Sequence, residues 1–348
     1  MRNFSMRLIN LVLIITVPYL HSCDDKHIEN NKNVVKGTEV IGSDSLGFVS
    51  DFLIVNDKIV LLDDKPINND NQIRVYDRNN YQFLYSLGRI GSGPGEFRQG
   101  MSMNLVHYNK YYFSLLDLSS KQMLFFYENI NSQLIYSHNI PLKGGRPYMP
   151  ISISDTIIYS LCLEIFEGRF AQYDNLGNKV QTLGEIPPGK KEDTPVPVHQ
   201  QASKGVMRLT PDGSKLIISY QFADMIDIYD LKGNLLNRIT GKLGKTPIYE
   251  TSIRNGYPTM IIDFNKCIYG FLDIEVTNNS IVALYSGKML NESEYESDQV
   301  HIYTFDGKLK DVYKLNTMVS QIALDTEKER LLACSYFPVP KIYSFKLE

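Results

Sequence analysis

The stretch LTPDGSKLIISYQFADMIDIYDLKGNLLNRI, residues 209–239, decides the fold of this chain. It contains four short β-prone runs separated by turn signals. Asp212-Gly213 predicts a hairpin turn between the first two runs, because such turns need residues that accept a positive φ. Lys232-Gly233-Asn234 predicts a second turn before the run that ends at Ile239. No run shows the 3.6-residue apolar period of a helix, so the stretch predicts a four-stranded antiparallel sheet.

The third run of this stretch is one copy of a recurring pattern, in which alternating apolar residues precede an aromatic and an acidic or polar residue. The copies are Ile73–Asp77, Phe125–Glu128, Phe170–Asp174, Ile226–Asp230, Ile302–Asp306 and a truncated one, Ile342–Phe345. They recur at blade-sized intervals of roughly 40 to 60 residues, with one longer interval after Asp230. The repeats predict an all-β, six-bladed β-propeller with an insertion in the fifth unit. Two alternatives stay open: a pair of β-sandwiches, or a seven-bladed ring whose seventh blade lies in the long interval.

The two ends of the domain fit together in this interpretation. The last copy is followed by only a few residues, so its blade lacks an outer strand. The β-prone segment 33–41 precedes the first blade and can supply that strand. Pairing of this kind removes a sheet edge that would otherwise favour aggregation. We therefore expect residues 33–41 to complete the last blade and close the ring.

Composition excludes some classes of protein. The 36 Lys and Arg are balanced by 39 Asp and Glu, for a net charge of −3, and no basic block is present. A nucleic-acid partner is therefore not predicted. Cys162, Cys267 and Cys334 lie far apart without a CxxC pair, so neither a disulfide framework nor a zinc site is predicted.

The N-terminus predicts secretion and a lipid anchor. Arg2 and Arg7 precede an apolar run, residues 8–20, that is shorter than the roughly 20 residues a membrane-spanning helix needs. The run ends in Leu20-His21-Ser22-Cys23, which resembles a bacterial lipobox. We expect a signal peptide over 1–22, a lipidated Cys23 with a polar tether over 23–32, and the propeller over 33–348. The alternative is an ordinary secretory signal with a coincidental cysteine.

The predicted location is the bacterial cell envelope, with attachment to a membrane through the lipid. Asp24-Asp25 follows the predicted lipidation site. It resembles both surface-export and retention signals of lipoproteins, so outer-membrane, periplasmic and surface-exposed positions stay open.

Two segments resemble a known family. Leu87–Phe97 (LGRIGSGPGEF) is similar to the glycine-rich connector of NHL-type propellers, and Leu209–Leu216 is similar to the PDG hairpins of TolB-type propellers. The chain therefore resembles the TolB-like, NHL-related six-bladed propeller lipoproteins. This resemblance implies a lipid-anchored envelope protein that binds a ligand more commonly than it catalyses a reaction. Residues 91–97 are interpreted as a connector between blades, not as a phosphate-binding loop, because related turns recur in other units.

No catalytic signature is present in the sequence, and no cofactor is predicted from the residues themselves. We expect the scattered histidines of the mature chain to be surface or turn residues: His27, His107, His138, His199 and His301. Related six-bladed lactonases hold Ca²⁺ in the central channel, and this implies four candidate metal ligands by position: Asp51, Asp263, Asp273 and Glu275.

Candidate ligand-binding residues come from three unusual loop stretches. With no Trp but 23 Tyr in the chain, Tyr and Arg are expected to supply the binding anchors. The candidates are Arg146, Tyr148, Tyr249, Arg254 and Tyr257. The predicted function is a non-catalytic binding module for a peptide, a glycan or a partner protein. The alternative is a lactonase-like, metal-dependent hydrolase or lyase in the channel.

Overall fold

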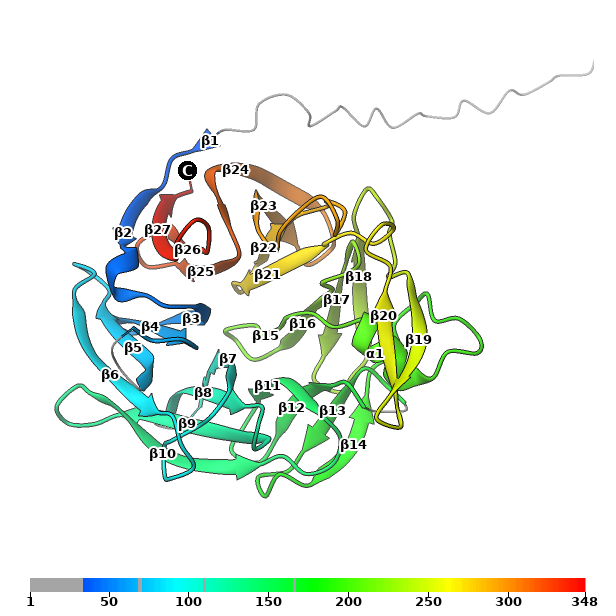
Figure 1. Ribbon diagram of the computed structural model, residues 1–348, viewed down its shortest axis with the longest axis horizontal. Helices are drawn as coiled ribbons and strands as arrows, with labels where there is room; N and C mark the ends of the chain where they lie inside the picture. Colours follow the sequence, from blue (N-terminus) through cyan, green and yellow to red (C-terminus); the bar gives the residue numbers. More distant parts are fainter. Residues whose placement is uncertain (1–33, 68–70, 109–110, 165–166, 348) are drawn as a thin grey trace, which may run out of the picture. The chain divides into compact units, whose positions relative to one another are not determined.

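The computed structural model describes residues 34–67, 71–108, 111–164 and 167–347. In this part the chain is a six-bladed β-propeller, in which six antiparallel sheets surround a central channel (Figure 1). The innermost strand of each sheet contacts the innermost strands of both neighbours, so the ring is closed. The predicted fold class and blade number are confirmed. The predicted signal peptide, Cys23 and the tether lie outside the described residues.

Apart from the outer strand of blade 6, which comes from the N-terminal segment, the strands of each blade follow chain order from the channel outward. Blades 1 to 3 consist of β3 (Val49–Val55), β4 (Lys58–Asp63), β5 (Asn71–Asp77) and β6 (Phe83–Arg89); β7 (Gly100–Leu105), β8 (Tyr111–Asp117), β9 (Gln122–Glu128) and β10 (Leu134–Pro141); and β11 (Pro147–Ser152), β12 (Ile158–Cys162), β13 (Phe170–Tyr173) and β14 (Lys179–Leu183). Blades 4 to 6 consist of β15 (Met207–Leu209), β16 (Lys215–Ser219), β17 (Met225–Asp230) and β18 (Leu235–Thr240); β21 (Phe271–Val276), β22 (Ser280–Tyr285), β23 (Ser297–Thr304) and β24 (Leu309–Val319); and β25 (Gln321–Asp325), β26 (Arg330–Ser335) and β27 (Lys341–Lys346).

The recurring sequence pattern marks the third strand of every blade, and its acidic residue has a structural role. The carboxylate of Asp230 accepts hydrogen bonds from the backbone N–H groups of Lys232 and Asn234, at 2.9 and 2.8 Å. Asp77 and Asp174 hold the corresponding turns in blades 1 and 3 in the same way. Hydrogen bonds to the ionised form lower the pKa of such a carboxyl group, as they do for all three residues. The repeat therefore reports turn geometry, not a binding site.

The core of the propeller consists of six separate apolar clusters, one between each pair of neighbouring blades. Successive side chains of a strand point to opposite faces of its sheet, and here each face packs on a different blade. In β5, for example, Val75 packs toward blade 2 while Tyr76 packs toward blade 6. Because each blade buries both of its faces, stability depends on closure of the whole ring.

The N-terminal segment closes the ring, as expected, but it contributes to two blades. β2 (Thr38–Ile41) pairs antiparallel with β27 and becomes the outer strand of blade 6. β1 (Val34–Val35) pairs in parallel with β24, the outer strand of blade 5. The segment is therefore not one strand from end to end, because it passes from the edge of one blade to the edge of the next.

The long interval in the fifth unit contains a two-stranded sheet instead of a seventh blade. It consists of β19 (Tyr249–Arg254) and β20 (Tyr257–Ile262), with the tight turn at Asn255-Gly256, where both residues have positive φ. β20 contacts α1 (Val196–Ala202), which lies between blades 3 and 4 in the chain. We call α1, β19 and β20 the insertion (Figure 1). No helix in the described ranges is long and apolar enough to cross a membrane.

Candidate functional site

Among the polar side chains that the innermost strands bring to the central channel, five form one cluster. They are Asp51 on β3, Asn104 on β7, Arg208 on β15, and Asp273 and Glu275 on β21. Residues at the beginning of these strands line one mouth of the channel, and residues at their ends line the other mouth. Three of the four candidate metal ligands, Asp51, Asp273 and Glu275, therefore lie at the channel.

Asp51 and Asp273 occupy equivalent places in blades 1 and 5 and connect neighbouring inner strands. The Asp51 carboxylate accepts hydrogen bonds from the N–H groups of Phe52, at 2.9 Å, and of Met103 in blade 2, at 2.6 Å. The Asp273 carboxylate accepts hydrogen bonds from the N–H groups of Ile274 and of Ile322 in blade 6, at 2.8 and 2.9 Å. Each strand carries a register shift at this aspartate, which turns the carboxylate toward the next blade.

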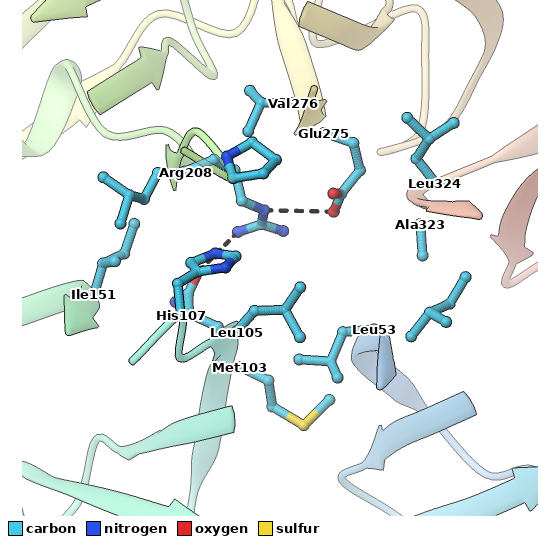
Figure 2. A pocket seen from close by; sticks show the side chains of 14 residues that line it. Leu53, Met103, Leu105, His107, Ile151, Arg208, Glu275, Val276, Ala323 and Leu324 are labelled. Atoms are coloured by element: carbon cyan, nitrogen blue, oxygen red, sulfur yellow. Dashed lines mark hydrogen bonds and ion pairs between the residues drawn. The ribbon is translucent and has the colours of Figure 1, made fainter. Parts of the chain in front are cut away.

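Arg208 is the cation at the centre of the cluster. Its guanidinium group donates to Glu275 at 3.5 Å, to Asp273 at 3.4 Å and to the side-chain carbonyl of Asn104 at 3.3 Å. Figure 2 shows Arg208 between Glu275 and His107 at one mouth of the channel. The arginine thus joins blades 2, 4 and 5 across the channel, and its own donors are directed at protein groups.

Burial sets the ionisation of the carboxyl groups. Burial raises the pKa of Asp51 to about 7, although Arg208 and the two N–H donors act in the opposite direction. Burial likewise raises the pKa of Glu275 to about 7, against the attraction of Arg208. Since one arginine faces three carboxyl groups, the cluster carries excess negative charge when all of them are ionised. Its charge therefore changes close to neutral pH.

The mouth at which the inner strands begin is a cavity of about 470 Å³ to which all six blades contribute. We call it the mouth cavity. Its floor contains Asp51, Asp273 and Arg208, and its walls are largely aromatic: Phe48, Tyr148, Phe271, Tyr295, Tyr336 and Phe337. Phe48 and Phe337 are 42% and 58% exposed, so large apolar side chains at this rim face solvent. The opposite mouth encloses only about 80 Å³ (Figure 2).

The candidate binding residues divide between two distant places. Tyr148 lies in the wall of the mouth cavity, where burial raises its pKa to about 12. Arg146, two positions earlier in the sequence, is exposed and does not line the cavity. Arg254 and Tyr257 form a cross-strand pair at the exposed tip of the insertion hairpin. Of these four predicted binding residues, only Tyr148 lines the channel.

Tyr249 and Asp263 contact other residues of the insertion hairpin and its neighbours, and neither lines the channel. Tyr249 is 2% exposed, and its hydroxyl lies 2.6 Å from Nδ1 of His199. Nε2 of His199 lies 2.7 Å from the carbonyl oxygen of Pro187. Asp263 forms an ion pair with Lys266 at 3.0 Å after β20, away from the innermost strands. Asp263 is therefore not a channel ligand.

His199 is expected to be a surface or turn residue, and this expectation is wrong, because the residue is fully buried in α1. Burial lowers its pKa, so the neutral imidazole is favoured. The carbonyl of Pro187 accepts the Nε2 proton, and this leaves Nδ1 to accept from Tyr249. His199 therefore joins α1 to the hairpin.

Within the described ranges, no group of three or more His, Cys, Asp or Glu side chains is placed to hold a metal ion.

Residues 91–97 run between β6 and β7, as expected for a connector. The Glu96 carboxylate lies within the loop, against Gly91 and Gly93, and accepts a hydrogen bond from the N–H of Gly93 at 2.8 Å. Phe97 is fully buried in the cluster between blades 1 and 2. The glycine-rich loop is therefore closed by its own glutamate and anchored by its phenylalanine.

Comparison with known proteins adds one finding. A family model described as "TolB-like 6-blade propeller-like" matches residues 32–327, which is most of the chain. No curated protein matches the sequence. The matched region includes every residue of the channel and of the mouth cavity except Tyr336 and Phe337.

Proposed function

The chain belongs to the TolB-like six-bladed propeller family, and on this premise we propose that it is a lipid-anchored protein of the bacterial cell envelope that binds a ligand without chemical conversion. The ligand is a peptide, a glycan or a partner protein. It occupies the mouth cavity, where the inner strands begin.

The aromatic rim of the mouth cavity is the observation that supports this proposal most. Soluble proteins rarely leave several large apolar side chains exposed around one concave surface unless that surface binds something. Phe48 stacks on Tyr336 with ring centroids 4.8 Å apart, so the two rings form a stacked aromatic pair at the rim. Aromatic residues of this kind are the usual anchors of binding surfaces, because they bury a large area and have few rotamers.

The polar floor favours binding over catalysis. Asp51 and Asp273 hold neighbouring strands together through backbone N–H groups, and Arg208 is engaged by Glu275, Asp273 and Asn104. A general base or a nucleophile must be free to approach the reacting atom, whereas these hydrogen bonds hold the side chains in place in the scaffold. A held carboxylate can still attract a ligand group that comes to it, because it has acceptor sites left. The metal-dependent hydrolase or lyase remains the competing hypothesis, and tight binding of one divalent ion per chain by the purified protein would favour it.

Replacing Phe48 with alanine is expected to weaken ligand binding by about tenfold or more, because an exposed anchor is lost while the fold is kept. Ligands are first selected on the wild-type protein from a random peptide library and a glycan array, and their affinities are then measured by titration calorimetry. Tyr257→Ala is the matched control, since Tyr257 is 71% exposed on the insertion hairpin. Ligands that tolerate Phe48→Ala but are lost in Tyr257→Ala would move the site to the hairpin, and a failure to select any ligand would count against a binding module.

Replacing Cys23 with alanine is expected to move the protein from the membrane fraction to the soluble fraction. The acyl chains on a lipidated cysteine each contribute about 0.8 kcal/mol per buried methylene, and no other anchor is predicted. The distribution is measured by fractionation and immunoblotting, with Lys26→Ala in the tether as the control. Membrane retention of the Cys23 variant would contradict the lipid anchor and leave the propeller's binding role unaffected.

A further inference from the structure

We propose that the group which enters the mouth cavity is a cation, namely a lysine or arginine side chain or a terminal amine of a peptide or protein ligand. This inference rests on the proposed function, since it names the ligand class of the same cavity. Three features of the cavity support it: the charges on its floor, the hydrogen bonds that already occupy Arg208, and the chemistry of its walls.

The carboxylates of the mouth cavity outnumber its cations. Asp51, Asp273 and Glu294 line it, and Arg208 is the only described basic residue that does so. No described Lys or Arg lies within ion-pair distance of Asp51 or Glu294, whereas Arg208 pairs with Asp273 and Glu275. A ligand cation that reaches the floor would supply the missing partner in a region where water screens charges weakly.

Arg208 offers little to an anionic ligand. Its Nε atom faces Glu275, one terminal nitrogen faces Asp273, and the other faces Asn104 and the carbonyl oxygen of Met207. An incoming carboxylate or phosphate would have to displace these contacts and would approach Asp51 and Asp273 at close range. The arrangement therefore selects against anions.

The walls fit the rest of a cationic side chain. The walls include the rings of Tyr148, Tyr295 and the stacked Phe48–Tyr336 pair. Ring faces attract Lys and Arg head groups, and the methylene stems of these side chains cover apolar surface well. A cation with an aliphatic stem satisfies both the walls and the floor, whereas a compact inorganic ion would leave the walls uncovered.

Affinity for such a ligand should increase with pH between 6 and 8. Other ionisable groups from the neighbouring blades also face Asp51 or line the channel near it. They are Tyr148, Arg208, Asp273, Glu275, Glu294, Tyr295 and Tyr336, and His107 lies on the far side of Arg208, at the other mouth. Burial raises the pKa of Asp51 to about 7, so this carboxyl is largely protonated at pH 6 and ionised at pH 8. A lysine ammonium stays charged over that range. Binding should therefore release protons and be severalfold tighter at pH 8 than at pH 6.

Matched tripeptides test the inference on the purified protein. Acetyl-Gly-Lys-Gly-amide is compared with its Nε-acetyl-lysine counterpart, and the arginine peptide with the citrulline peptide, because each pair differs mainly in charge. Titrations followed by calorimetry or NMR should show at least tenfold tighter binding of the charged member. No binding of either charged peptide, equal binding within each pair, or preference for a Gly-Glu-Gly peptide would overturn the inference.

Substitutions locate the effect. Glu294→Gln should reduce the preference for the charged peptides severalfold without touching the scaffold, since Glu294 is an exposed rim residue. Asp51→Asn should reduce it further and remove most of its pH dependence, while Asp311→Asn on the outer strand of blade 5 is the control. A charge preference that survives in both cavity variants would contradict the assignment.

The inference and the proposed function fail in different ways. Selected peptides or glycans that need Phe48 but are neutral or acidic would retain the mouth cavity as the binding site and reject its cation preference. Selected ligands that are indifferent to Phe48 would reject the site itself.

Discussion

Replacing Asp227 with alanine is expected to lower the free energy of unfolding by about 3 to 5 kcal/mol, because it leaves buried charge and hydroxyl groups without their acceptor. Asp227 lies on β17 and is fully buried. Its carboxylate accepts from Nε and a terminal nitrogen of Arg238 at 2.6 and 2.9 Å. It also accepts from the hydroxyls of Tyr220 and Tyr229 at 2.7 and 3.2 Å. One carboxylate thus satisfies four donors between blades 3 and 4.

The surroundings of Asp227 make its loss more costly than that of a surface ion pair. The guanidinium of Arg169 lies 4.7 Å from the centre of the Tyr220 ring, so a second buried cation adjoins the network. Hydrogen bonding to Asp227 raises the pKa of Arg238. Removing Asp227 takes this effect away, but a guanidinium keeps its proton in proteins, so the arginine stays charged without its partner. Urea unfolding measures the change, and Asp311→Ala, at an exposed ion pair, should leave stability almost unaltered. A loss below about 1 kcal/mol for Asp227→Ala would show that water or a rearrangement replaces the carboxylate.

The blades were predictable from the sequence because each depends on local features. The third strand shows the pattern in every blade because its alternating side chains face two neighbouring blades. In blades 1, 3 and 4 its acidic residue also holds the following turn. The Asp-Gly and Gly-Asn turns next to it follow from backbone conformation alone. Ring closure by the N-terminal segment was predictable for a different reason, as a sheet lacking one strand needs a partner for its edge.

The channel was only partly predictable, because its chemistry depends on residues from separate blades. Asp51, Asp273 and Glu275 were found from their expected places on inner strands, but Arg208 was not. In the sequence, Arg208 is only a charged residue between Met207 and Leu209, in the shortest inner strand. Its acidic partners Asp273 and Glu275 come from another blade, so they can be recognised only when the geometry of the ring is known. The use of both aspartates as connections between blades also needs the register shifts, which the sequence does not reveal.

The insertion shows why tyrosine content alone could not identify the binding residues. Tyr249 and Tyr257 are eight positions apart on the same hairpin, yet Tyr249 is buried against His199 and Tyr257 is 71% exposed. What separates them is the packing of α1 on the hairpin, a contact between segments about 50 to 60 residues apart in the chain. Long-range packing of this kind leaves no pattern in a single sequence.

Replacing Phe97 with alanine is expected to destabilise the protein by about 3 to 5 kcal/mol, the range for emptying a fully buried aromatic site. The ring lies between blades 1 and 2, and a Cβ atom added at Gly88 would approach it within 2.5 Å. Gly88 also has a φ of +73° near the end of β6, so the chain uses this glycine both for its backbone conformation and for the space that the ring occupies. The connector is thus built around Phe97.

Two further measurements separate a connector from a recognition loop. Phe264→Ala removes an aromatic ring that is 56% exposed and should change stability little, which controls for the loss of an aromatic side chain as such. Ligands selected on the wild-type protein should bind the folded Phe97→Ala variant with nearly unchanged affinity, because the mouth cavity is lined by other residues. Since the outer side of residues 91–96 borders a separate surface hollow of about 460 Å³, the opposite result is also informative. Unaltered unfolding energy together with lost binding would assign recognition to this loop and make the mouth cavity secondary.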